Sequence, residues 1–153
     1  MMDLFRSLFG ESRPAEPSDA AQLATAALLV EAAFTDGTLA ESEQALIDRL
    51  LAEHFGLSQA AALNLRTRAI ALQKDSSQLF PLTRTLVTQC DGAQRIALLE
   101  MLWAVAYADG TLHDYEASLV RRLAGLLYVS DQDSGRVRRR VLERLGLEPP
   151  RTP

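Results

Sequence analysis

The sequence is poor in cysteine, in aromatic residues and in long apolar runs. Its single cysteine, Cys90, cannot form an intrachain disulfide, and it excludes a zinc site built from several thiolates. Aromatic residues make up 6% of the 153 residues, and valine and isoleucine are also sparse, which disfavours a β-sheet. No apolar run approaches the roughly 20 residues that a membrane-spanning helix needs. We therefore expect no integral membrane segment.

Charge and missing motifs exclude further classes of protein. The net charge of -4 gives no electrostatic reason to expect nucleic acid. The arginines between residues 136 and 144 lack interleaved aromatic residues, so single-stranded nucleic acid is not expected either. Asp3 and Arg6 interrupt the N-terminal apolar residues, so no signal peptide is predicted and a cytoplasmic location is expected. Two histidines and one cysteine offer little for a catalytic triad, and no phosphate-binding loop occurs, so we expect no enzyme.

The residues that are abundant favour helices. Alanine and leucine dominate a chain that is 48% hydrophobic. Apolar residues recur at helical spacing through most of its length, and no segment alternates as a strand does. The sequence predicts an all-α bundle of about seven helices. The expected helices span residues 19–35, 38–56, 58–73, 77–90, 93–108, 111–128 and 130–146.

Several helix boundaries are marked by capping residues. Thr38 is followed three residues later by Glu41, the pattern of a capping box at a helix N-terminus. Ser58 and Ser130 are candidate N-caps further along, and glycines stand where several helices are expected to end. Pro81 is tolerable only in the first turn of its helix.

The chain is predicted to consist of a helical domain with two appendages. The domain spans residues 18–147, and residues 148–153 are expected to be a disordered tail. Residues 1–17 are predicted to be an arm and linker outside the domain. Residues 2–9 have amphipathic helical spacing, which indicates either a loosely docked arm or a weak membrane or partner contact. The apolar residues of this segment are Leu4, Phe5, Leu8 and Phe9.

The two halves of the domain repeat each other. A shift of 73 positions aligns residues 33–39 with residues 106–112, and both segments contain Asp-Gly-Thr-Leu. Glu43 then aligns with Glu116, and the apolar residues that follow also match. Two helical hairpins of the same design are therefore predicted. We expect them to pack about a pseudo-twofold axis that brings the two Asp-Gly corners close together.

Four carboxylates of the repeat stand where local rules disfavour them. Glu43 lies three residues before Leu46 on the apolar stripe of its helix, and Glu116 repeats this placement. A buried carboxylate is costly unless it is paired or bound to a metal. Asp36 and Asp109 stand at helix C-termini, where the macrodipole disfavours negative charge. A divalent cation bound by all four residues would satisfy them.

The alternative for these residues is purely structural. In it, the Asp-Gly pairs form corner turns, and the glutamates pair with arginines such as Arg49 and Arg122. The repeat would then record only a duplication.

Each corner also matches the second half of an EF-hand calcium loop. The ligand positions of the first half are held by Ala32 and Phe34 in one copy and by Val105 and Tyr107 in the other. None of these side chains supplies a carboxylate, so a site would have to be assembled from both copies. Ligation by oxygen alone suits calcium, magnesium or manganese.

At these corners the chain resembles the tellurite-resistance protein B (TerB) family. The shared feature is an Ala-Asp-Gly corner followed by an acidic residue in the next helix, present twice. Residues 32–37 with Glu43 and residues 106–110 with Glu116 carry it here. Thr35 departs from the pattern, because alanine is usual at that position.

The resemblance covers about residues 19–146. It implies an all-α bundle of about seven helices, a metal-binding acidic cluster and a link to bacterial stress or tellurite resistance. A similar domain precedes J-domains in some membrane-anchored co-chaperones, so a protein-protein interaction module without bound metal is the alternative. We therefore expect a non-enzymatic protein that binds a divalent cation, with an unidentified protein partner as the second hypothesis.

Overall fold

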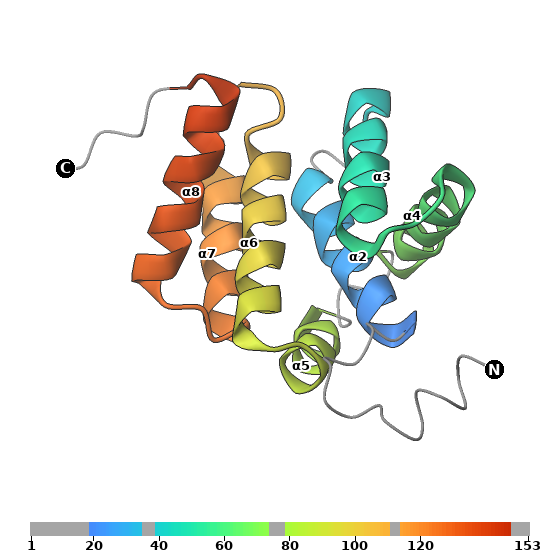
Figure 1. The fold of residues 1–153 in the computed structure, drawn as a ribbon, viewed down its shortest axis with the longest axis horizontal. Helices are drawn as coiled ribbons and strands as arrows, with labels where there is room; N and C mark the ends of the chain where they lie inside the picture. Colours follow the sequence, from blue (N-terminus) through green and yellow to red (C-terminus); the bar gives the residue numbers. More distant parts are fainter. Residues whose placement is uncertain (1–18, 35–38, 74–78, 111–113, 148–153) are drawn as a thin grey trace.

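Seven helices make up the described part of the chain (Figure 1). The structure is a computed structural model, and it describes residues 19–34, 39–73, 79–110 and 114–147. No strand occurs within these ranges, so the prediction of an all-α bundle of about seven helices is confirmed. The helices are α2 (Asp19–Ala33), α3 (Glu41–Phe55), α4 (Gln59–Gln73), α5 (Leu79–Gln89), α6 (Gly92–Ala106), α7 (Asp114–Leu126) and α8 (Asp131–Leu145).

The internal repeat organises the fold. A shift of 73 residues turns the bounds of α2 into those of α6, and a shift of 72 turns those of α4 into those of α8. The first repeat is therefore α2, α3 and α4, and the second is α6, α7 and α8. Figure 1 shows the two sets side by side, with α5 across one end. Helix α5 has no counterpart within the first repeat.

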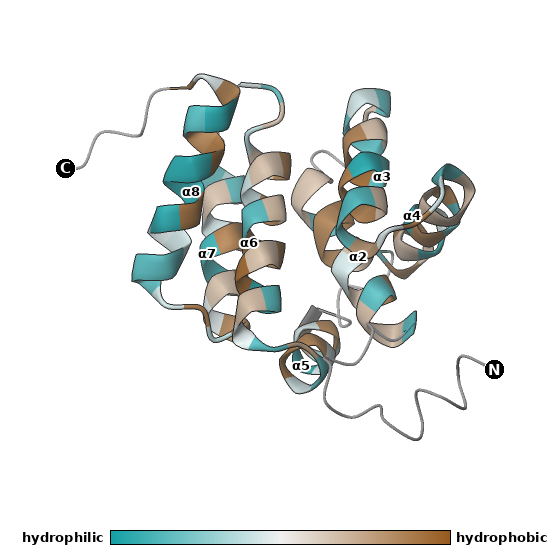
Figure 2. Ribbon diagram, viewed as in Figure 1, coloured by the Kyte–Doolittle hydropathy of each residue, from teal (hydrophilic) through white to brown (hydrophobic). Residues whose placement is uncertain are grey.

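Helix α2 forms the centre of the core. It packs against α3, α4, α5, α6 and α7, and ten of its fifteen residues are buried. Burial extends around most of the helix, because its alanines allow the neighbouring helices to approach closely. Its counterpart α6 supplies the largest buried side chain, Trp103. The predominantly apolar colouring of both helices is visible in Figure 2.

Local capping explains most helix ends. The Ser58 and Ser130 hydroxyls each accept a bond from the backbone N–H three residues on, as predicted. Gly56 and Gly146 take the left-handed conformation directly after α3 and α8. Asp91 lies between two of the helices expected from the sequence, and its carboxylate caps α6 by accepting from the Gln94 N–H at 2.8 Å.

The appendages predicted at residues 1–17 and 148–153 lie outside the described residues, so those boundaries stay predictions. Within the described ranges, no helix is both long and apolar enough to cross a membrane.

Candidate functional site: a groove between the two repeats

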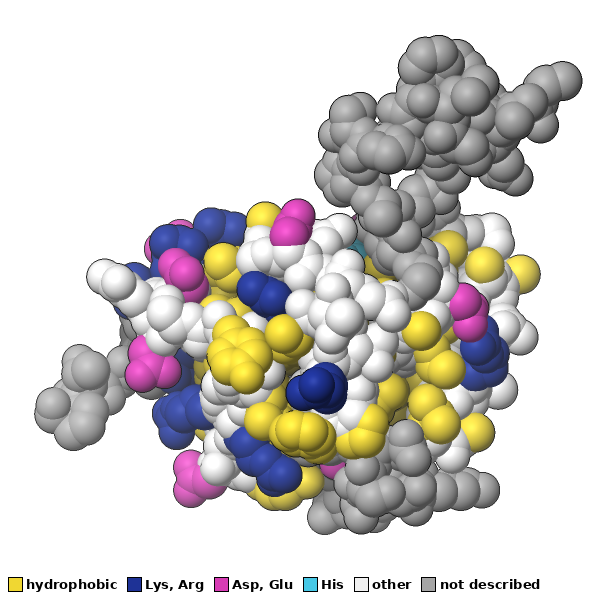
Figure 3. All heavy atoms as spheres, turned by 90° about the horizontal axis from the view of Figure 1, so that it is seen from below, with side chains coloured by type: hydrophobic (Ala, Val, Ile, Leu, Met, Phe, Trp, Pro, Cys, Tyr) yellow, Lys and Arg dark blue, Asp and Glu magenta, His cyan; other side chains and the backbone are white. Residues whose placement is uncertain are grey.

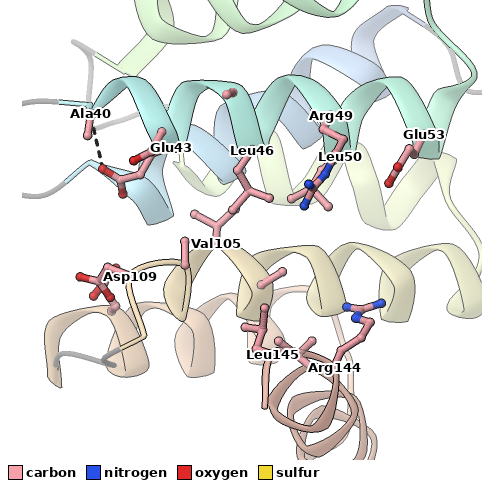
Figure 4. Close-up of a pocket in the computed structure, with 16 residues that line it drawn as sticks. Ala40, Glu43, Leu46, Arg49, Leu50, Glu53, Val105, Asp109, Arg144 and Leu145 are labelled. Atoms are coloured by element: carbon pink, nitrogen blue, oxygen red, sulfur yellow. Dashed lines mark hydrogen bonds between the residues drawn. The ribbon is translucent and has the colours of Figure 1, made fainter. Parts of the chain in front are cut away.

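A groove of about 1030 Å³ separates α3 of the first repeat from α6 and α8 of the second (Figure 4). Apolar side chains line much of its length, with carboxylates and arginines among them. Its principal apolar residues are Leu46, Leu50, Val105, Val141 and Leu145. Its charged residues are Glu43, Arg49, Glu53, Asp109, Glu116 and Arg144. The groove thus contains three of the four residues predicted to bind a metal.

Glu43 enters the groove from the first turn of α3. The helix begins at Glu41 with Ala40 as its N-cap, so the capping box predicted from Thr38 and Glu41 is wrong. Instead the Glu43 carboxylate accepts a bond from the Ala40 N–H at 3.3 Å. Glu43 is only half-buried, and the positive end of the helix dipole favours its charge. The Ala40 bond and the helix dipole therefore explain why a carboxylate is tolerated on the apolar stripe of α3.

Asp109 lies in the turn that follows α6. This turn is closed by the Gly110 N–H, which donates to the Tyr107 carbonyl at 2.9 Å. Gly110 has φ of 84°, a left-handed conformation that a glycine adopts without strain. Asp109 is exposed near the carbonyl end of α6, where the dipole disfavours a negative charge, as predicted.

Glu116 is the buried carboxylate of the site. It is the third residue of α7, as Glu43 is the third residue of α3, so the repeat places both at the same helical position. Only 5% of Glu116 is exposed. The prediction of burial on an apolar stripe is confirmed for Glu116, whereas Glu43 is less buried than expected. Two equivalent residues therefore differ in solvation.

The carboxylates come from different elements but share one region. Figure 4 shows Glu43 and Asp109 at the same end of the groove, on opposite walls. Asp36, the fourth predicted ligand, lies outside the described residues. Among described residues, no group of three or more histidine, cysteine or acidic side chains could hold a metal ion. The oxygen donors suit a hard cation, but the described residues alone do not form a complete coordination sphere.

Sequence reasoning missed the other part of the groove. Leu46 and Leu50 share the apolar pattern of this helix, but only Ile47 and Leu51 of α3 are buried. Arg49 and Glu53 interrupt the apolar residues along this wall, a mixture that could have signalled a groove. On the opposite side, the Arg144 guanidinium lies 3.1 Å from the Glu100 carboxylate.

A second, much smaller cavity of about 10 Å³ is lined by His54 and Cys90. Burial lowers the pKa of His54, and burial is also the main cause that raises the pKa of the Cys90 thiol. Both shifts favour the neutral side chain. A cavity of this size holds about one water at most, so it offers no room for a ligand.

The comparison with protein families decides the classification. A family model described as "Tellurite resistance protein TerB" matches residues 22–139, which is more than half of the chain. The chain belongs to the TerB family. The TerB match begins within α2 and ends within α8, so it includes both Asp-Gly corners and the residues of α3 and α6 that line the groove. No curated protein and no solved structure matches the chain.

Proposed function

We propose that this TerB domain is a non-catalytic protein that binds one divalent cation at the acidic end of the groove. The proposed ligands are Asp36, Glu43, Asp109 and Glu116, and calcium, magnesium and manganese are the candidate cations. The family's description supplies the proposed biological setting, a part in tellurite resistance or a related bacterial stress response.

One observation carries the cation proposal: carboxylates from the start of α3, the turn after α6 and the start of α7 line the same groove. Like charges near one another repel, and Glu116, at 5% exposure, is the least solvated of the three. A hard cation offsets that repulsion. Asp36 follows α2 as Asp109 follows α6, so the repeat would supply it as the fourth ligand.

The composition of the groove supports a binding role without catalysis. Among the described residues that line it, Ser42 is the only hydroxyl side chain, and there is no histidine or cysteine. A nucleophile activated by a neighbouring base needs a pair of such groups within hydrogen-bond reach.

Thermal melting in the presence of each cation, and in chelator, tests the proposal. A ligand that binds only the folded state stabilises it by about 2.7 kcal/mol at 100 times its Kd. We expect the wild type to melt at a higher temperature with cation than with chelator. The double variant Glu43→Gln with Glu116→Gln should lose this difference.

Glu53→Gln is the matched control, because Glu53 lines the same groove on the same helix but lies further along it (Figure 4). It should retain the cation-dependent rise. An equal rise in the double variant and in the control would contradict binding at the proposed carboxylates.

A protein-interaction module is the second candidate, and the apolar lining of the groove favours it. In such a module the apolar side chains would carry the binding, and the carboxylates would only border the contact. This candidate predicts equal melting temperatures in cation and in chelator for every variant.

A further inference from the structure

The groove has a filled counterpart in the other half of the molecule. Under the repeat, its walls α3 and α6 correspond to α7 and α2. Helix α5 packs against both α2 and α7. The pair of helices that encloses an open groove in one half therefore holds an additional helix in the other.

The exposure of equivalent side chains agrees with this difference. Leu119 and Leu123 of α7 are 6% and 0% exposed. Their counterparts in α3, Leu46 and Leu50, are only partly buried and line the groove. Leu145 on the neighbouring wall is 47% exposed. The first repeat thus leaves uncovered an apolar surface that the second repeat buries.

The order of elements along the chain indicates what could cover it. Helix α5 directly precedes α6, the first helix of the second repeat. The segment that precedes α2, the first helix of the first repeat, contains residues 2–9. Its Leu4, Phe5, Leu8 and Phe9 recur at helical spacing, the pattern of a helix that lays one apolar face into a groove.

The connection to α2 is long enough for this arrangement. Residues 10–18 separate the segment from Asp19, and nine extended residues span roughly 30 Å. Helix α2 itself has 15 residues, which corresponds to about 22 Å. Because α3 and α6 both pack against α2, their shared groove lies within reach of the segment.

We propose that residues 2–9 dock into the groove of their own chain and cover Leu46, Leu50 and Leu145, in the place that corresponds under the repeat to that of α5 between α2 and α7. A short tether gives the segment an effective concentration in the millimolar range, so a weak contact is sufficient. Docking of residues 2–9 rests on the apolar part of the groove and does not require a bound cation.

Disulfide trapping in the full-length chain tests the contact. Four double variants combine Leu145→Cys with a cysteine at one of positions 4, 5, 8 or 9, all in a Cys90→Ser background. Two cysteines form a disulfide readily only when their Cα atoms approach within about 7 Å. We expect at least one of the four to form an intrachain disulfide under mild oxidation.

Leu63→Cys is the matched control partner, because Leu63 is also 47% exposed but lies on α4, outside the groove. Intrachain trapping should be much slower with position 63 than with position 145. Equal trapping at both positions would overturn the proposal, and so would the absence of trapping at position 145. Disulfide-linked dimers as the main product would assign the groove to a second copy and would also overturn it.

Hydrogen exchange tests the same contact without introduced cysteines. Replacing Phe5 and Leu8 with aspartate should speed hydrogen exchange in residues 41–55, whereas Asp3→Asn with Arg6→Gln should not. Unchanged exchange in the aspartate variant would contradict a docked segment.

Discussion

Arg138 donates a hydrogen bond from Nε to the Tyr107 hydroxyl at 2.8 Å. The same guanidinium lies over the Trp103 ring, 4.6 Å from its centroid. These contacts tie α8 to the last residues before the turn that carries Asp109. The outer side of α8 is largely hydrophilic, as Figure 2 shows. Arg138 is a partly buried charged residue of this helix, and its guanidinium packs against the Trp103 ring.

Removing this bond should destabilise the domain modestly. Tyr107→Phe keeps the ring and removes the hydroxyl, and a hydrogen bond to a charged group contributes about 1.5–3 kcal/mol. We expect a loss of about that size in the free energy of unfolding, measured by urea denaturation. Arg139→Ala is the control, because Arg139 is exposed on the same helix, and it should change stability by less than about 0.5 kcal/mol. Equal losses in the two variants would show that the Tyr107 contact is not special.

Tyr128 is a strained residue whose replacement should stabilise the fold. It has φ of 57°, and it is the only non-glycine residue with positive φ among the described residues. A left-handed conformation costs a residue with a side chain roughly 1–2 kcal/mol. The side chain is 77% exposed, so little packing would be lost. Tyr128→Gly should therefore raise the free energy of unfolding by about 1 kcal/mol.

The equivalent position in the first repeat is a glycine, and replacing it should lower the free energy of unfolding. Gly56 occupies the equivalent place after α3 with φ of 66°, and no atom lies within 4 Å of a Cβ added there. Gly56→Ala should cost about 1 kcal/mol through backbone conformation alone. A destabilising Tyr128→Gly would mean that the exposed ring makes a contact that offsets the strain.

The end of the molecule formed by α5 and the α7–α8 turn, seen in Figure 3, exposes apolar side chains between arginines. Phe80 at 61% and Tyr128 at 77% are its most exposed large apolar residues among those described. Scattered exposed residues of this kind are normal on soluble proteins and need no ligand to explain them.

Local chemistry made most of the fold predictable. The Ser58 and Ser130 hydroxyls cap their helices through bonds that depend on residues three positions apart. The capping rule failed at Thr38. Helix α3 begins later than predicted, at Glu41, and the Glu43 carboxylate accepts a bond from the Ala40 N–H. The shift of 73 positions would pair Phe55 with Tyr128, whereas the backbone conformation pairs Gly56 with Tyr128.

The groove was not predictable from periodicity. Leu46 and Leu50 share the apolar pattern of α3 with Ile47 and Leu51, but only the latter pair is buried. Which residues lie against neighbours depends on how the two repeats pack, and a single helical period does not contain that information. The repeat predicted that four acidic residues would lie in one region; Glu43, Asp109 and Glu116 line the same groove, and Asp36 lies outside the described residues, so the four-residue site stays a prediction.

Stability should fall as the pH is lowered past the normal pKa of histidine, and His54 should account for part of this loss. Burial lowers the pKa of His54 in the folded state below the ordinary histidine value of 6.5. Folding therefore favours the neutral imidazole. The contribution of His54 to the free energy of unfolding is fully present above pH 6.5, and it is lost as the pH falls through the pKa of the folded state. His54→Gln keeps a neutral side chain and should flatten the decline.

Urea unfolding at several values between pH 7.5 and pH 5 measures the effect. Wild type and variant should differ in the slope of stability against pH, and the slopes should converge above pH 7. Parallel slopes throughout the range would show that His54 titrates normally in the folded protein.

Native mass spectrometry with calcium, magnesium or manganese, with and without chelator, tests the central claim most directly. The proposed site predicts one divalent ion per chain in the wild type and in Glu53→Gln, removed by chelator, and no bound ion in the Glu43→Gln and Glu116→Gln double variant. Isothermal titration would give the affinity of the same samples. A wild type that binds no ion, or a double variant that binds one ion as tightly as the wild type, would contradict cation binding at this end of the groove.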